Sequence, residues 1–374
     1  MTDPRTTPLH ERHSALGASF TDFGGWSMPV RYSSDLAEHH TVRTAGGLFD
    51  ISHMAEFLVE GPEAGAFLDY ALAGRLSTLV DDQAKYSLVL DPDGGIIDDV
   101  IVYRHDAERL MVVANAGNRD AVAAALTERA VAYDVEIEDA TDRIALIAVQ
   151  GPASQAILEA TAEIIDLAAP LGDLKYYRMT HARFAAPGVD PVPIHIGRTG
   201  YTGEDGFELY VPATSAVAVW DVVLRVGEPL GLVPAGLASR DTLRLEAGMP
   251  LYGHELSLDI VPAQAGLGRV VAIDKDDFVG RAGLSAVVAS DAPVLVGLVS
   301  AGKRAGRAGY AVLHGEDVVG EITSGALSPT LGHPIAMAFV APAASGPGTE
   351  LFIDVRGTRI PATVTALPFY RRAK

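Results

Sequence analysis

The sequence contains no cysteine. This absence excludes disulfide bonds, thiol catalysis, Cys-ligated zinc and iron–sulfur clusters, and it fits a reducing compartment. No run approaches the roughly eighteen apolar residues that a membrane span needs, and the N-terminal stretch has no apolar segment of signal-peptide length. We therefore expect a cytoplasmic protein that has no membrane association.

Positive charge is also scarce. Lys and Arg number 29 against 48 Asp and Glu, which gives a net charge of −19. Such a surface repels phosphates, so we expect no binding to nucleic acid. An anionic ligand would need a local basic patch, and the two candidates are 303–307 and 371–374, although each taken alone is typical of solvated surface.

The length and apolar content allow a large core. With 374 residues and 48% apolar side chains, the chain is expected to form two or three domains. Helix and strand patterns alternate up to about residue 285. Beyond it the pattern changes to short, evenly spaced strands without a long helix, which predicts a separate small barrel or jelly roll.

One hairpin carries two unusual carboxylates. The stretch 85–104 predicts two strands joined by a turn at 91–95, and the second strand places Asp98 and Asp99 among aliphatic residues. Aspartate is depleted in strands, and both faces of this strand are otherwise apolar, as in a strand covered on both sides. The pair is either structural, with one Asp paired to a core Arg, or functional.

Strand parity separates the two aspartates. Successive side chains point to opposite faces, so Asp99 shares a face with Tyr103, an aromatic ring that can stack on a planar ligand. This favours Asp99 as the functional member.

Two further stretches carry polar groups at informative spacings. A second predicted hairpin has its tip at 203–206, with Tyr201 before it and Glu208 on the returning strand, opposite in face to Phe207. A strand carboxylate can accept two parallel hydrogen bonds from an amidine-like edge, such as that of a pterin. The helix predicted over about 236–247 places Arg240 and Arg244 on one side.

Two histidine pairs were considered as metal ligands. His10 and His13, and the adjacent His39 and His40, lack a recognised zinc spacing with a third ligand. We therefore predict no metal site.

Seven motifs in order carry a family resemblance. They are TPLHERH, VRTAGGLFDISHM, GGIIDDVIVY, IAVQGP, GYTGEDGFELY, RDTLRLEAGMPLYGHEL and ITSGALSPTLG. In this order the chain resembles the T-protein family of the glycine cleavage system, the aminomethyltransferases, from Thr7 to the C-terminus.

The resemblance implies an α+β fold: a three-domain cloverleaf of antiparallel sheets with helices around a central funnel, ending in a small β-barrel. Residues 1–54 and 141–280 would form a discontinuous folate-binding domain, 55–140 an inserted domain bearing the Asp98-Asp99 hairpin, and 285–374 the barrel.

The resemblance also implies a reaction. The family takes an aminomethyl group from the lipoyl arm of the H protein, transfers its carbon to tetrahydrofolate as methylenetetrahydrofolate, and releases ammonia. Tetrahydrofolate is a co-substrate, and neither a metal nor a flavin is expected. Folate supplies the nucleophilic nitrogen and the partner supplies the thiol, so a cysteine-free enzyme suffices.

Carried over by position, the essential carboxylate falls in Asp98-Asp99, and we expect Asp99 to stabilise developing positive charge. Glu208 matches the carboxylate at the pterin edge. Further folate-site positions, and a basic residue near the funnel mouth, are matched by Tyr201, Arg240, Met54, Tyr86, Ile101, Tyr103, Val113, Asn115 and Arg371.

Two alternatives stay open. A folate-dependent demethylase would use the same scaffold on a small methylated amine or sulfur compound, but LEAGMPLYGHE favours the aminomethyltransferase. A non-enzymatic folate-binding maintenance protein would carry a Lys-Gly-Cys motif where this chain has Ala247-Gly248-Met249.

Overall fold

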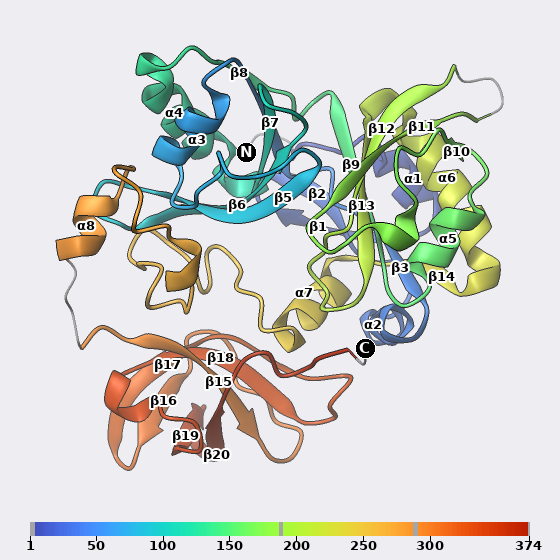
Figure 1. Cartoon of the computed structure of the whole chain (residues 1–374). Helices are drawn as coiled ribbons and strands as arrows, with labels where there is room; N and C mark the ends of the chain where they lie inside the picture. The colour runs from blue at the N-terminus through green and yellow to red at the C-terminus, as the bar shows by residue number, and fades with distance from the viewer. Residues whose placement is uncertain (1–3, 187–189, 287–290, 373–374) are drawn as a thin grey trace. The chain divides into compact units, whose positions relative to one another are not determined.

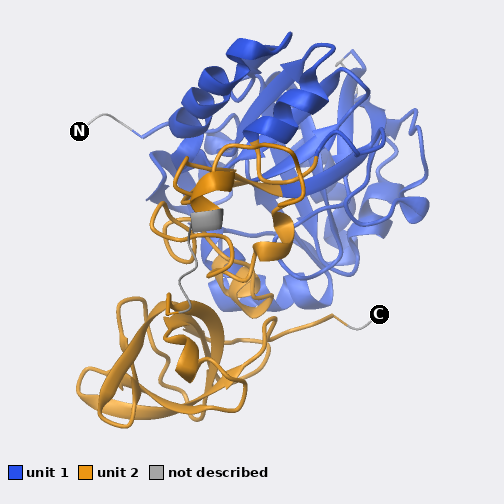
Figure 2. Ribbon diagram, turned by 60° about the vertical axis from the view of Figure 1, so that its left-hand side comes forward, with its two compact units in different colours: residues 1–71, 76–86, 100–240 blue, residues 72–75, 87–99, 241–374 orange. Residues whose placement is uncertain are grey.

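The computed structural model describes residues 4–186, 190–286 and 291–372, and it has mixed α+β architecture (Figure 1). The chain forms two compact units, coloured in Figure 2. Unit 1 comprises 1–71, 76–86 and 100–240, and unit 2 comprises 72–75, 87–99 and 241–374. The predicted α+β class with a C-terminal barrel is confirmed, whereas the three-domain boundaries stay a prediction. No helix in the described ranges is long and apolar enough to cross a membrane.

A seven-stranded sheet in unit 1 has the order β10-β11-β12-β13-β9-β3-β14. Only β14 pairs in parallel, with β3; the other pairs are antiparallel. Helices α5 (Ser154–Ala160) and α6 (Ala216–Gly227) pack on it, and Trp220 of α6 is fully buried in their shared core. The strands are β3 Gly46–Asp50, β9 Ile144–Gln150, β10 Ile164–Ile165, β11 Met179–Phe184, β12 Val192–Gly197, β13 Gly206–Pro212 and β14 Leu232–Pro234.

The N-terminal segment adds smaller elements to unit 1. Helix α1 (His10–Ala15) is followed by a hairpin of β1 (Ser19–Phe23) and β2 (Trp26–Arg31), and then by α2 (Asp35–Thr44). The sequence also predicts a Pro/Gly turn at 186–191, between two strands; its residues 187–189 lie outside the described residues.

A five-stranded sheet has the order β5-β6-β7-β4-β8, and α3 (Ala64–Ala71) packs beside α4 (Arg119–Arg129) on it. Two of its strands run from one unit into the other, because the unit boundaries fall after Tyr86 and after Asp99. The strands are β4 Ala55–Glu60, β5 Gln83–Leu90, β6 Ile96–Arg104, β7 Arg109–Ala114 and β8 Glu136–Asp139.

The hairpin with the two aspartates is confirmed as β5–β6. Its turn is held by Asp91, whose Oδ1 accepts hydrogen bonds from the amides of Asp93 at 3.0 Å and Gly95 at 2.8 Å. The even-numbered face of β6 is buried, but Ile97 and Asp99 keep partial exposure. The prediction of a strand covered on both sides is therefore wrong for the odd-numbered face.

The C-terminal segment closes into a six-stranded barrel in the order β15-β18-β17-β16-β19-β20. Its first and last strands pair, so no strand edge is left open. Helix α8 (Arg281–Ala286), which the sequence reasoning missed, precedes it. The barrel strands are β15 Val294–Ser300, β16 Ala311–His314, β17 Asp317–Leu327, β18 Pro334–Val340, β19 Glu350–Val355 and β20 Thr358–Thr365.

Buried polar contacts within unit 2 join the C-terminal end of α7 (Leu237–Glu246) to the barrel. Arg244 Nη1 lies 3.0 Å from Glu255 Oε2, and its Nη2 donates to Ser324 Oγ at 2.8 Å. Glu246 accepts hydrogen bonds from Ser328 Oγ at 2.5 Å and Thr330 Oγ1 at 2.8 Å. The motifs RLEAG and ITSGALSPT thus hold each other in place.

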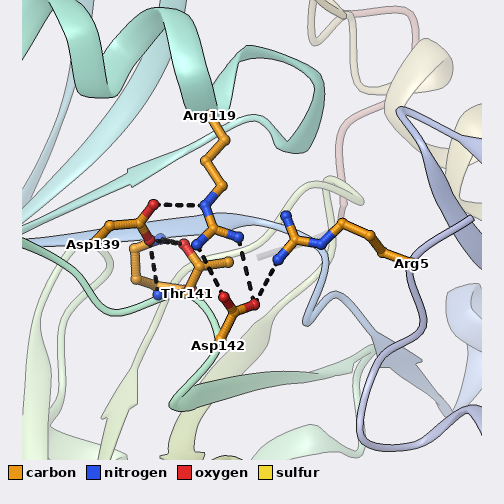
Figure 3. A network of polar contacts seen from close by, with 6 residues as sticks. Arg5, Arg119, Asp139, Thr141 and Asp142 are labelled. Carbon is orange, nitrogen blue, oxygen red and sulfur yellow. Dashed lines mark hydrogen bonds and ion pairs between the residues drawn. The ribbon is translucent and has the colours of Figure 1, made fainter. Parts of the chain in front are cut away.

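A polar network in unit 1 fixes the return from β8 to β9 (Figure 3). Arg119 Nε donates to Asp139 Oδ2 at 2.6 Å and its Nη2 to Asp142 Oδ2 at 3.2 Å, while Arg5 Nη2 donates to Asp142 Oδ1 at 2.6 Å. Thr141 Oγ1 donates to the other oxygen of Asp139 at 2.6 Å. The bonds from Arg119 hold the pKa of Asp142 below its usual value.

Glu56 of β4 is the buried carboxyl beside this network. It is fully buried, and neither of its carboxyl oxygens has a hydrogen-bond partner among the described residues. Burial raises its pKa well above 4.5, and Asp139 adds to the rise while Arg119 opposes it. Burial therefore favours the neutral, protonated form of Glu56 in the folded protein.

This state makes stability depend on pH. Below 4.5, the ordinary value of a Glu pKa, Glu56 is protonated in both the folded and unfolded states. As pH rises from there toward the raised folded pKa, only the unfolded state ionises, which costs the fold about 1.4 kcal/mol per pH unit. We expect Glu56→Gln to remove this loss, measured as the free energy of urea unfolding across that window.

Glu60→Gln, at an exposed position of the same strand, serves as the control and should keep the wild-type slope. An identical pH dependence for Glu56→Gln and wild type would show that Glu56 is ionised in the fold.

Candidate functional site

Alternation along β13 divides its side chains between two environments. Phe207 and Leu209 enter the core beneath α5 and α6. Glu208 and Tyr210 lie on the other face, where the ring of Tyr210 meets Tyr103 of β6 edge-on at 5.2 Å between centroids. The predicted division of faces is confirmed, and it places a carboxylate in an aromatic setting.

Glu208 is 6% exposed and is held by a threonine hydroxyl. Thr199 Oγ1 donates to Glu208 Oε2 at 2.5 Å, and the same hydroxyl lies 2.8 Å from the hydroxyl of Tyr103. Burial raises the pKa of Glu208, while the bond from Thr199 and the nearby Arg240 partly oppose the rise. Glu208 is thus an acceptor in a site of low polarity.

The loop 198–205 positions Thr199. The second hairpin is confirmed as β12–β13, but its connection is this irregular loop rather than a tight turn at 203–206. Gln150 of β9 is fully buried; its Nε2 donates to Thr199 O at 3.1 Å and its Oε1 accepts from Thr202 Oγ1 at 2.9 Å. A Cβ at Gly200 or Gly206 would overlap Gln150. These glycines therefore allow the amide to enter the loop.

Two arginines make a second set of contacts with the loop 198–205. Arg43 Nη1 donates to Thr202 O at 2.7 Å and lies 3.0 Å from Glu204 Oε1. Arg198 pairs with Asp205 through two bonds, of 3.0 and 2.5 Å. The loop is thus a fixed structure before any ligand arrives.

Arg240 brings a cation next to Glu208. Its guanidinium carbon lies 4.9 Å from the centre of the Tyr201 ring, a cation–π arrangement. Burial lowers the pKa of Arg240 and Glu208 raises it in return. Its Nη1 is buried and has no hydrogen-bond partner among the described residues. A buried, unpaired guanidinium N–H is a donor that a ligand can satisfy.

His53 also belongs to this cluster, and the sequence reasoning missed it. Burial, and after it the positive charge of Arg240, lower its pKa to about 4 against the opposing effect of Asp50. Its Nδ1 is buried and unpartnered within the described chain. The available signal was its place directly after β3, where polar residues follow a buried strand.

Asp50 is buried, and its negative charge acts on His53 while its own oxygens have other partners. Its Oδ2 accepts from Thr7 Oγ1 at 2.6 Å and lies 2.8 Å from His13 Nε2, while His13 Nδ1 meets the Tyr32 hydroxyl at 2.8 Å. Despite burial, the His13 and Thr7 bonds lower the pKa of Asp50. His13 is thus a core histidine with a partner at each ring nitrogen, so its role in the motif TPLHERH is structural.

Other candidate residues gather at one end of the five-stranded sheet. Ile101 and Val113 are register partners on β6 and β7, and Ala114 pairs with Ala55, next to Met54. Asn115 follows β7, and Tyr86 lies on β5 beside β6. All except the buried Val113 keep partial exposure.

The aspartate pair and Arg371 belong to unit 2. Asp98 is fully buried, whereas Asp99 is half-buried. Tyr252 lies near both: burial raises its pKa first, and then Asp98 and Asp99 raise it further. Arg371 is exposed near the end of the described chain. Among the candidates in unit 1, Tyr103, Tyr201 and Arg240 lie with Glu208, whereas Met54, Tyr86, Ile101, Val113 and Asn115 belong to the five-stranded sheet or follow its strands.

Comparisons with known proteins agree over the whole chain. The family "GCVT N-terminal domain" matches residues 9–275, and "Glycine cleavage T-protein C-terminal barrel domain" matches 294–371. Aminomethyltransferases of Cutibacterium acnes and Streptomyces coelicolor are each 53% identical; the alignments cover all of this chain and 100% and 99% of theirs. The crystal structure of glycine cleavage system aminomethyltransferase T from Bartonella henselae superposes with a TM-score of 0.89 at 37% identity, covering 99% of both chains.

The loop contacts make a prediction for Gln150. In Gln150→Leu, Thr199 O and Thr202 Oγ1 lose their buried partner, so we expect the free energy of unfolding to fall by about 2 to 5 kcal/mol. Protease cleavage within 198–205 should also accelerate. Urea unfolding measures the change in stability, and limited proteolysis measures the rate of cleavage in the loop.

Gln83→Leu removes one exposed hydrogen bond, to the Val80 amide, and should change stability far less. Equal effects of the two substitutions would mean that Gln150 does not hold the loop.

Proposed function

This chain belongs to the glycine cleavage T-protein family, a family of aminomethyltransferase enzymes, and from this premise we propose its reaction. It transfers the aminomethyl carbon from the lipoyl arm of the H protein to tetrahydrofolate, releases ammonia and forms methylenetetrahydrofolate. Full-length relatives that are aminomethyltransferases favour this reaction over a free-amine demethylase and over a non-enzymatic role.

The observation that carries the proposal is the buried Glu208 with its oriented carboxylate. A pterin presents an amino group beside a ring nitrogen, and a carboxylate accepts two parallel hydrogen bonds from such an edge. The Thr199 bond fixes the plane of the Glu208 carboxylate. The raised pKa of Glu208 reflects a desolvated acceptor, for which a ligand donor is worth most.

Arg240 and His53 offer further polar atoms to the same ligand. Their buried Nη1 and Nδ1 atoms have no partner within the described chain. The lowered pKa of His53 keeps its ring neutral, so Nδ1 acts according to its tautomer as donor or acceptor. We propose that both satisfy polar atoms of folate, with Tyr201 holding the Arg240 guanidinium in place.

Asp99 is the member of the aspartate pair that we assign to the chemistry. It is half-buried, whereas Asp98 is fully buried and less able to meet a ligand. Asp99 lies on one continuous strand and on the same face as Tyr103, which reaches Thr199. A fixed carboxylate there stabilises positive charge that develops at the reacting nitrogen. When bound, tetrahydrofolate supplies the nucleophile.

Glu208→Gln tests the pterin contact. The amide keeps the shape but replaces one acceptor oxygen with a donor, so two parallel bonds from the pterin edge can no longer form. We expect the Kd for tetrahydrofolate, measured by calorimetry, to rise about 10- to 100-fold, the range of 1.4 to 3 kcal/mol for a charged hydrogen bond.

Glu228→Gln, at an exposed site in unit 1, is the matched control and should bind as wild type does. Wild-type affinity in Glu208→Gln would remove Glu208 from the folate site.

Asp99→Asn tests the catalytic assignment. With aminomethylated lipoyl H protein and tetrahydrofolate, wild type should release ammonia and form methylenetetrahydrofolate. Asp99→Asn should bind tetrahydrofolate normally but turn over at least about 100-fold more slowly, the scale of losing one preorganised electrostatic contact. Both products are measured in a stopped assay.

Asp93→Asn, in the exposed turn of the same hairpin, should retain full activity. Full activity of Asp99→Asn with an inactive, folded Asp98→Asn would reverse the assignment within the pair. Absence of both products with wild type, or product from a small free methylated amine instead, would contradict the proposed reaction.

A further inference from the structure

Three histidines from distant parts of unit 1 converge outside the Glu208 cluster. They are His105, His181 and His195, and one ring nitrogen of each lies within 4.8 Å of the others. Their ring centroids are 4.7 to 5.8 Å apart. No local spacing in the sequence connects the three, so the sequence does not indicate that they meet.

The backbone places all three. His181 on β11 and His195 on β12 are direct partners in the antiparallel register, so their side chains lie on one face of the sheet. His105 follows the end of β6, and its amide donates to Arg109 O at 2.9 Å in the turn toward β7. The cluster therefore joins the seven-stranded sheet to the five-stranded sheet within unit 1.

Asp82 orients the central ring. Its Oδ1 lies 2.7 Å from His181 Nε2, so that nitrogen carries the proton and His181 Nδ1 presents a lone pair. His195 Nδ1 lies 2.8 Å from His181 Nδ1 and, with this tautomer of His181, donates a hydrogen bond to it. A bound ion would take the place of that shared proton. A carboxylate behind a histidine, with the other nitrogen pointing into a histidine cluster, is the arrangement that orients metal-bound imidazoles.

The position of Asp82 is itself fixed. Its backbone has a φ of 61°, in the left-handed region that costs energy for most residues, although Asp tolerates it better than most. Its amide donates to Arg104 O at 2.8 Å, and its carbonyl accepts from the Met179 amide at 2.9 Å. Asp82 is thus tied to the two strands that lead to His105 and His181.

The surroundings leave the rings able to bind a cation. The rings of His105 and His195 are partly buried and pack against each other and against that of His181. An imidazole binds a metal ion through the lone pair of one ring nitrogen. The charge of Arg109 is partly offset by Asp106, at 2.6 Å. The side chain of His181 is 39% exposed, which leaves an entry path and room for a water ligand.

We propose that His105, His181 and His195 form a binding site for one divalent transition-metal ion of the Zn²⁺ class, with Asp82 as the positioning residue behind His181. Three imidazoles with one open position fit tetrahedral zinc, and imidazole selects this class over Mg²⁺ or Ca²⁺. The ion would connect the β6–β7 turn to the β11–β12 hairpin. It would therefore stabilise unit 1, because it binds the folded chain alone.

The test uses the full chain, freed of metal with a chelator and titrated with Zn²⁺ against a chromophoric chelator. We expect one tight Zn²⁺ per chain and a higher Tm in its presence. His195→Ala and His105→Ala should each weaken binding at least about 100-fold, and Asp82→Asn about 10- to 100-fold. Bound Co²⁺ should show the visible bands of a four-coordinate site.

His314→Ala, at an exposed histidine on β16, is the control and should bind Zn²⁺ as wild type does. Circular dichroism checks that each variant is folded. His105→Gln takes the place of His105→Ala if the alanine variant is unfolded. No saturable binding, or equal binding by wild type and the folded His105 and His195 variants, would overturn the proposal. The readouts are metal content and Tm, so they stand independently of the transfer reaction.

Discussion

The hydrogen bonds from buried Gln150 to the loop 198–205 are the constraint on which the Glu208 cluster depends. They fix Thr199, whose hydroxyl orients Glu208 and meets Tyr103. Two glycines leave the space that the Gln150 side chain fills. Residues of three strands, β6, β9 and β13, thus hold the Glu208 carboxylate in place through side-chain contacts.

Five buried carboxylates show two different environments. Asp50, Glu204 and Glu255 are each paired with His13, Arg43 and Arg244 respectively. Glu56 and Glu208 lie buried without such an ion pair, and burial raises the pKa of both. For Glu56 the consequence is a pH-dependent cost in stability. Arg240 lies near Glu208, but no hydrogen bond joins the two side chains among the described residues. Glu208 is therefore an acceptor that a ligand can use.

Sequence reasoning recovered the parts that local patterns determine. The two hairpins, the six barrel strands and the division of faces at Phe207 and Glu208 follow from alternation and turn residues. The irregular loop 198–205 did not follow, because side chains from distant segments, Gln150 and Arg43, hold it. His105, His181 and His195 were missed because the β11–β12 pairing and the turn after β6 bring them together, and no spacing in the sequence records that arrangement.

The central claim is that Glu208 receives the pterin edge of tetrahydrofolate in this family member. A crystal structure of the protein with tetrahydrofolate tests it most directly. Our account predicts the pterin amino group and adjacent ring nitrogen within hydrogen-bond distance of the two Glu208 oxygens, with Arg240 Nη1 or His53 Nδ1 contacting the ligand. A pterin bound elsewhere, with Glu208 still contacting only its protein partners Thr199 and Tyr103, would contradict it.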